Sequence, residues 1–435
     1  MKHTSFLLLL FTLLFSDVEV HSQTTEFEVE GIKVLLKPSN KQVISAQLFL
    51  DGGTGNYTKE QEGIEALALA AVTEGGTLNY PKTEFFGKLE KMGSIISNSA
   101  EYDYSKISLR CLTSYWDESW ELFADAIRNP AFNEDEFMNI KNQLVAGAKN
   151  AESDADSHLR NIGMSNAFKD LNYSKVPDGT ATSLEKLTWG QVQKYYKRLL
   201  GKDQLVLVVV GSIDEADLKA KIARSFGDLK AAGIPVRPEG KVFFNESSYS
   251  EESREIATNY IRGYMNAPDI GSEDEVAMRV AYSILYDRFF KEIRTERNLS
   301  YAPAAAFPSS ILGNPYTLLY VSTDKPNEAV AVMINEIRNI CKDGFDASEL
   351  TNKKGDFLTR HYMGMETVGS QANSLGQATL SGDWKRTDKF IDAVDALSVE
   401  DLNAAFKKYA KGINWTYLGD TSVVDKSVFL QSIVD

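Results

Sequence analysis

The spacing of apolar residues changes along the chain, and each change marks an expected element. Residues 27–36 (FEVEGIKVLL) predict a β-hairpin around Gly31, and residues 43–50 predict a further strand. Long segments with helical spacing follow, and strands return between them, as at residues 106–112. This order predicts an α+β fold in which helices pack on a mixed sheet.

The pattern occurs twice. Four pairs of segments match in the same order at offsets close to 210: residues 126–129 and 336–339, 132–137 and 345–350, 187–200 and 397–410, and the strands that end at Gly211 and Gly419. One match could arise by chance, but four in order indicate an internal duplication. The sequence therefore predicts two homologous domains of about 206 residues, each a mixed sheet with packed helices.

The duplication also suggests where the domains begin and end. Residues 231–252 contain prolines, glycines, serines and charges without a sustained helical period, which is typical of a linker. We expect an N-terminal domain at residues 23–230, this linker, and a C-terminal domain at residues 253–435. Residues 1–22 are expected to be a signal peptide.

The signal-peptide assignment follows from a basic start and the apolar run FLLLLFTLLF at residues 6–15. Ten such residues are too few to cross a bilayer but suit a secretory signal. The sequence thus predicts an exported protein, periplasmic or secreted, with no membrane span in the mature chain.

Composition narrows the possible functions. Of the 435 residues, 43% are hydrophobic and 25% are charged, as in a soluble globular protein, and the formal net charge is -14. A body of that sign would repel phosphates, which argues against nucleic-acid binding. Cys111 and Cys341 are the only cysteines, so neither a disulfide framework nor a thiolate metal site is expected.

Residues 63–77 (GIEALALAAVTEGGT) predict a helix that is apolar on all sides and therefore buried. Together with the duplication and the LEKMG of residues 89–93, this segment resembles the insulinase/pitrilysin-like zinc metallopeptidases, most closely their processing-peptidase branch. The resemblance covers essentially the whole mature chain.

Active members of that family carry His-x-x-Glu-His on this helix; the histidines bind zinc and the glutamate acts as general base. In this chain the corresponding positions hold Ala66, Leu69 and Ala70. The family's third ligand, a glutamate, aligns near Gly147, and no carboxylate lies between residues 136 and 152. Alkyl groups have no lone pair for a cation, so we expect no metal ligand and no catalytic residue here.

Two histidines of the mature body could in principle form another site. His158 and His361 lie in separate copies, and neither has a second histidine at helical spacing. A lone histidine is more often a surface or structural residue, so we expect no cofactor in this chain.

The second copy contains FFKEIRTERNLSY at residues 289–301, which resembles the family's C-terminal Arg/Tyr element. The resemblance implies that Arg294 and Tyr301 bind substrate, by donating hydrogen bonds to backbone carbonyls and to the reacting carbonyl. The alternative is a surface ion-pair arginine and a partly buried aromatic. Cations every three residues from 288 to 297 favour a solvated helix face over a docking site for acidic peptides.

Some members of the family divide the site between two chains. The resemblance therefore implies a non-catalytic, substrate-positioning subunit of an exported heterodimeric zinc metalloendopeptidase that acts on peptides. The homologous partner subunit would carry His-x-x-Glu-His and the zinc. The alternative is a peptidase-fold scaffold or peptide-binding protein with no proteolytic role, for which the Arg294–Tyr301 pair would have no use. An active single-chain peptidase would need ligands that the sequence lacks.

Overall fold

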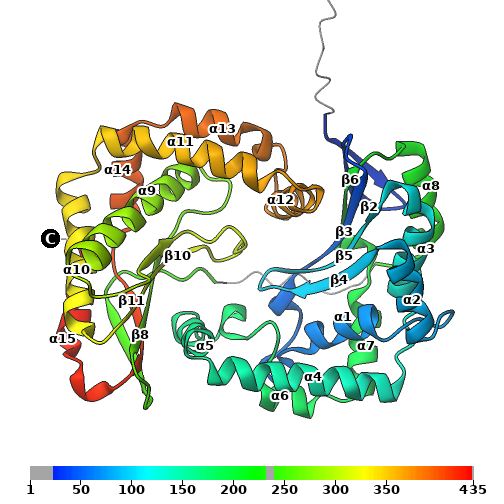
Figure 1. Cartoon of the computed structure of the whole chain (residues 1–435), viewed down its shortest axis with the longest axis horizontal. Coiled ribbons are helices and arrows are strands. Elements are labelled where there is room, and N and C mark those ends of the chain that lie inside the picture. Colours follow the sequence, from blue (N-terminus) through cyan, green and yellow to red (C-terminus); the bar gives the residue numbers. More distant parts are fainter. Residues whose placement is uncertain (1–22, 232–239, 434–435) are drawn as a thin grey trace, which may run out of the picture.

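A computed structural model describes residues 23–231 and 240–433. The predicted signal peptide and residues 232–239 of the predicted linker lie outside the described residues. The predicted α+β class is confirmed: two sheets, each with its own packed helices, make up the molecule (Figure 1).

The first sheet has six strands in the order β1-β2-β6-β3-β5-β4. Its strands are β1 (Thr25–Val29), β2 (Ile32–Pro38), β3 (Val43–Asp51), β4 (Ile95–Ala100), β5 (Tyr104–Leu112) and β6 (Leu205–Gly211). The predicted hairpin is β1–β2, and its turn residues Glu30 and Gly31 both have positive φ, as a two-residue hairpin turn requires. Only β2–β6 is a parallel pair, so the sheet is mixed.

The second sheet repeats this arrangement with five strands in the order β7-β11-β8-β10-β9. Its strands are β7 (Ser248–Ser253), β8 (Asn259–Asn266), β9 (Ala304–Ala306), β10 (Tyr316–Thr323) and β11 (Asn414–Gly419). Its one parallel pair, β7–β11, corresponds to β2–β6. The order matches that of the first sheet once β1 is set aside, so the duplication extends to topology.

The helices repeat as well. Those of the first half are α1 (Ile64–Glu74), α2 (Lys82–Met92), α3 (Trp116–Arg128), α4 (Glu134–Ser153), α5 (Ala155–Ala167), α6 (Ala181–Lys186), α7 (Trp189–Leu199) and α8 (Glu215–Phe226). Those of the second are α9 (Asp274–Phe289), α10 (Pro326–Asp343), α11 (Ala347–Gly364), α12 (Val368–Leu380), α13 (Arg386–Ala396), α14 (Val399–Tyr409) and α15 (Lys426–Phe429). The repeated segments at 187 and 397 begin α7 and α14 with equivalent capping boxes, Thr188 with Gln191 and Ser398 with Asp401.

The two halves exchange one helix each. Helix α12, from the second half, packs on β3 and β6 of the first sheet, whereas α5, from the first half, packs on β8 and β11 of the second (Figure 1). Each sheet is therefore covered on one face by its own helices and on the other by a helix from the opposite half. This double coverage explains why β6 (LVLVVVG) is apolar at almost every position.

Glycines allow the exchanged helices to approach the sheets closely. A Cβ placed on Gly376 of α12 would lie 2.1 Å from Cε2 of Phe49 in β3. The equivalent contact in the other half is between Gly163 of α5 and Tyr264 of β8, where a Cβ would lie 2.8 Å from the tyrosine hydroxyl. In both places an aromatic ring occupies the space that a side chain would need.

A polar clasp joins the halves near the tip of the β4–β5 turn. The Tyr173 hydroxyl donates to the Asp103 carboxylate at 2.6 Å. That carboxylate also accepts the backbone N–H groups of Leu312 (2.7 Å) and Gly313 (3.2 Å) from the second half. Burial raises the pKa of Asp103 because the loss of hydration outweighs these hydrogen bonds.

The second sheet begins inside the segment that the sequence predicts as a linker. Strand β7 starts at Ser248 and pairs with β11, although its sequence SYSEES shows no apolar alternation. It is an edge strand with mostly exposed or half-buried side chains, so burial leaves little signal in its composition. The domain boundary itself stays a prediction.

Within the described ranges, no helix is both long enough and apolar enough to cross a membrane.

The exchanged-helix packing can be tested at Gly376. We expect Gly376→Ala to lower the free energy of unfolding by about 1–3 kcal/mol, because the methyl group must displace the buried Phe49 ring. The matched control is Gly355→Ala in α11, where a Cβ has nothing within 4 Å and alanine should stabilise the helix by up to about 1 kcal/mol. Urea unfolding of both variants measures the difference. Equal shifts would show that the close approach is not needed.

Candidate functional site

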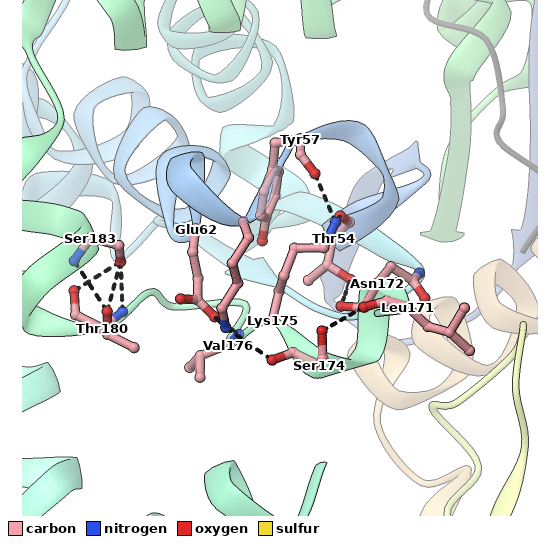
Figure 2. Close-up of polar contacts among 11 residues, drawn as sticks. Thr54, Tyr57, Glu62, Leu171, Asn172, Ser174, Lys175, Val176, Thr180 and Ser183 are labelled. Carbon is pink, nitrogen blue, oxygen red and sulfur yellow. Dashed lines mark hydrogen bonds and ion pairs between the residues drawn. The ribbon is translucent and has the colours of Figure 1, made fainter. Parts of the chain in front are cut away.

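The segment that precedes helix α1 fixes the position of the helix. Gly63, its N-cap, has a φ of 84°, and a Cβ there would lie 2.6 Å from the Cα of Gly179. The segment before the helix is tied to residues 172–176 by polar contacts (Figure 2). In particular, the Glu62 carboxylate accepts the N–H of Val176 and pairs with Lys59 at 2.7 Å.

Further hydrogen bonds fix the start of the same segment, at Thr54 and Tyr57. The Lys175 ammonium donates to the carbonyls of Thr54 (2.5 Å) and Tyr57 (2.7 Å), and the Thr54 hydroxyl donates to the carbonyl of Asn172 (3.1 Å; Figure 2). Because these bonds lock both ends of the loop, the start of α1 has a defined position.

The positions that would bind zinc carry no donor atom. Ala66, Leu69 and Ala70 are at most 5% exposed and lie on a helix that is buried from Ile64 to Thr73. Within residues 23–231 and 240–433, no group of three or more His, Cys, Asp or Glu side chains is arranged to hold a metal ion. The residues present do not fit zinc.

The neighbourhood of the expected third ligand gives the same answer. Gly147 is exposed on α4 with open space around it, whereas Leu144 and Ala148 are the nearby residues that pack against the first core. Whichever of these three is aligned with the family glutamate, no carboxylate results.

One carboxyl group near α1 was missed by sequence reasoning. Glu65 is fully buried and accepts hydrogen bonds from the hydroxyls of Ser105 and Tyr195 and, at 3.3 Å, from the Asn56 amide. Burial raises its pKa to about 7, and these hydrogen bonds oppose the shift. The signal in the sequence was a single acidic residue in an otherwise apolar helix. Glu65 ties α1 to β5 and α7 and has no access to solvent.

The two predicted substrate-binding residues lie in contact with each other. Arg294 belongs to a π-helix (Phe290–Glu296) that continues α9, and its guanidinium lies 4.1 Å from the centre of the Tyr301 ring and 4.7 Å from that of Phe290. Cation–π attraction at these distances favours keeping the guanidinium beside the rings. The Tyr301 side chain is 78% exposed, so its hydroxyl is open to solvent.

The neighbouring cations differ from Arg294 in their partners. Arg288 forms a two-point ion pair with Glu349, and both Arg297 and Lys291 lie within ion-pair distance of Glu292. No carboxylate in the described part of the chain lies within ion-pair distance of Arg294. Its donors are therefore not neutralised by a neighbouring acid.

The two parts of the expected site lie apart. Helix α1 belongs to the first half and α9, with the π-helix that follows it, to the second (Figure 1). Among the described residues, no hydrogen bond or ion pair connects α1 with Arg294 or Tyr301. The structure brings Arg294 and Tyr301 together but does not bring them to Ala66, Leu69 and Ala70.

The two histidines have structural partners. His158 lies 2.8 Å from the Glu252 carboxylate, and the His361 ring stacks on Phe390 with 5.3 Å between ring centres. Burial and, to a lesser extent, the charge of Lys37 lower the pKa of His361.

Comparison with known proteins places these features in context. Residues 33–176 match the family model described as insulinase (peptidase family M16), and residues 186–355 match the model described as the peptidase M16 inactive domain. Similar curated proteins include the non-peptidase homolog YmxG of Helicobacter pylori, 22% identical over 83% of this chain and 84% of that protein. The zinc protease PqqE of the same organism is 23% identical over 88% of each chain.

Solved structures show the same fold. A peptidase M16 inactive domain from Pseudomonas fluorescens superposes with a TM-score of 0.84 at 19% identity, covering 92% of this chain and 98% of that one. The periplasmic protease PqqL of Escherichia coli gives a TM-score of 0.77 at 14% identity, covering 91% of this chain and 46% of that one.

The buried Glu65 predicts a pH dependence of stability. Its pKa is about 7 in the folded chain and about 4.5 when unfolded, so between these values the folded state binds more protons. Stability should therefore fall as pH rises from about 4.5 to 7, by roughly 3 kcal/mol in total, and level off above. In Glu65→Gln this contribution is absent.

Urea unfolding at several pH values between 4.5 and 8 would measure the difference between wild type and Glu65→Gln. The exposed Glu90→Gln serves as the control and should leave the pH slope unchanged. A wild type and a Glu65→Gln variant with parallel pH profiles would contradict the assignment.

Proposed function

Because the chain belongs to the insulinase (M16) peptidase family, we propose that it is the non-catalytic, substrate-positioning subunit of an exported heterodimeric zinc endopeptidase that acts on peptides. The chain is a non-catalytic relative of the M16 peptidases: alkyl side chains stand at the zinc positions, and its relatives include a protein named as a non-peptidase homolog. The observation that carries the proposal is the Arg294–Tyr301 pair, in which the arginine lies over the tyrosine ring and has no carboxylate partner among the described residues.

The chemistry of this pair suits substrate binding. A guanidinium offers a rigid fork of N–H donors, and a phenol offers one O–H donor. Arg294 keeps its donors unpaired by any acid in the described chain, and Tyr301 exposes its hydroxyl. In the proposed complex both would donate to carbonyl oxygens of the peptide, including the one on which negative charge develops during hydrolysis.

The metal and the remaining chemistry would come from a partner. The proposed partner is a homologous subunit that carries His-x-x-Glu-His, binds one zinc and activates the attacking water. Chains related to this one include both a protein named as a zinc protease and one named as a non-peptidase homolog in Helicobacter pylori, which suits a family in which such divergence has occurred.

The location is also part of the proposal. The N-terminal apolar run resembles a secretory signal, and a periplasmic protease of Escherichia coli has the same fold. We therefore place the proposed complex in the periplasm or outside the cell.

The competing function is a scaffold or peptide-binding protein with no role in proteolysis. The loss of every zinc ligand fits this alternative equally well. The donor pair favours the subunit role, because a scaffold gains nothing from an exposed tyrosine that supports an arginine without an ion-pair partner in the described chain.

The role of the pair can be tested by removing one hydroxyl group. In the assembled complex, Tyr301→Phe keeps the ring under Arg294 but removes the donor, so we expect turnover to fall about 100-fold while the subunits stay associated. Steady-state kinetics and gel filtration measure the two effects. The control is Tyr115→Phe at another exposed tyrosine, and unchanged turnover in Tyr301→Phe would remove the assigned role.

The partner can be tested directly. The mature chain would be recovered from its native source under gentle conditions, and copurifying chains identified by mass spectrometry. We expect a stoichiometric partner with His-x-x-Glu-His, one zinc per pair, and peptide cleavage by the pair but by neither chain alone. A chain recovered alone or as a homodimer, without zinc or activity, would instead support the scaffold function.

A further inference from the structure

The second half contains a cavity of about 1170 Å³ that the Arg294–Tyr301 pair does not line. Its walls come from α9, α11, α12 and α13 and from the strand β9, and the first sheet contributes Gln47 and Lys106. The cavity is larger than the usual small-molecule site, which points to a peptide-sized ligand.

The charge of the cavity is opposite to that of the protein. The chain carries a formal net charge of -14, yet five Lys or Arg side chains line the cavity against a single carboxylate, Glu275. The five are Lys106, Arg279, Arg360, Arg386 and Lys389. A concave surface lined by one sign of charge concentrates ligands of the other sign.

Most of this positive charge is not neutralised within the chain. Arg279 and Arg386 share the one Glu275 carboxylate, at 2.7 and 2.9 Å, so this cluster alone keeps a net positive charge. Lys106 donates to the neutral amide oxygen of Asn373, and the Glu101 carboxylate, with which its charge interacts, lies beyond ion-pair distance. Arg360 and Lys389 are exposed, and no carboxylate of the described residues lies within ion-pair distance of either.

The cavity also offers a backbone and an apolar wall. Ala305 and Ala306 of β9 line it, and β9 is the last strand of the second sheet, with β10 as its only neighbour in the described part of the chain. An edge strand presents unpaired N–H and C=O groups to an incoming peptide. Phe357 and Phe390 also line the cavity and supply apolar surface.

We propose that this cavity binds an extended acidic peptide, which adds alongside β9 while its carboxylates face the lysines and arginines. The mode is strand addition: backbone hydrogen bonds supply affinity and the charged wall supplies selectivity. Only the consequence for proteolysis rests on the function proposed above: if the chain is the substrate-positioning subunit, the cavity selects acidic segments of the substrate.

The binding step can be measured on the purified mature chain alone. The probe is a fluorescein-labelled peptide in which Glu alternates with Val, and the comparison probe has Lys in place of each Glu. We expect the acidic probe to bind with an affinity that falls as salt rises, and the basic probe to bind at least about tenfold more weakly. Equal binding of the two probes would overturn the proposal.

Two variants locate the site. The double variant Arg360→Glu with Lys389→Glu changes exposed residues only, so the fold should survive, and we expect it to weaken the acidic probe about tenfold or more. The matched control reverses the charge of the exposed Lys411, outside the cavity, and should bind as wild type does. If the control weakens binding as much as the double variant, the attraction is a general charge effect and the site is refuted.

A third probe tests strand addition. Methylating alternate backbone nitrogens of the acidic peptide removes donors without changing charge, and we expect binding at least about tenfold weaker. Undiminished binding would overturn the pairing with β9. The outcome is separate from the subunit role: peptide binding is measured on this chain alone, whereas the subunit role is measured as turnover of the assembled complex, so each proposal can fail without the other.

Discussion

The structure depends on one constraint, which is that each sheet is apolar on both faces and must be covered twice. Strands such as β3 and β6 are buried along almost their whole length, and the helices that follow them in their own half cover only one face. The second face is covered by α12 on the first sheet and by α5 on the second. Separating the halves would expose both of these faces to water at once, so the two sheets form one cooperative body.

The two copies of the duplicated helix have different surroundings. Helices α1 and α9 hold equivalent places, and their buried glutamates Glu65 and Glu275 lie 210 residues apart. In α1 the buried glutamate accepts hydrogen bonds from two hydroxyl groups, and the helix is part of the core. In α9 the glutamate meets two arginines at the wall of a large cavity. One of the two equivalent helices thus packs inside the core, whereas the other lines the cavity for which we propose a peptide ligand.

Much of the fold could be predicted from the sequence because it is recorded in local patterns. The hairpin at Gly31, the repeated capping boxes at Thr188 and Ser398, and the offset near 210 all act within short stretches of chain. The exchanged helices could not be predicted this way, because amphipathic spacing shows that a helix has a buried face but not which sheet it covers. The sequence assigns most of β7 to the linker, because an edge strand of polar residues has no apolar alternation.

The same distinction applies to the site. The alkyl groups of Ala66, Leu69 and Ala70 are a matter of side-chain identity, which the sequence shows directly. The identity of Arg294 and Tyr301 was likewise visible, but the missing ion-pair partner of Arg294 and the ring that supports it are properties of the folded chain. The cavity was less accessible still, because its cations come from β5, α9, α11 and α13 and form no motif in sequence.

Both proposed functions depend on cationic side chains that have no ion-pair partner among the described residues. A surface arginine can pair with a nearby acid, and in a chain with 61 acidic and 47 basic residues such partners are plentiful. Arg288, Arg297 and Lys291 do have them. Arg294, Arg360 and Lys389 have none among the described residues, and all three belong to the second half. Donors kept available in an acidic protein are suited to anionic or carbonyl groups of another molecule, which is why we propose both the positioning pair and the peptide-binding cavity in the second half.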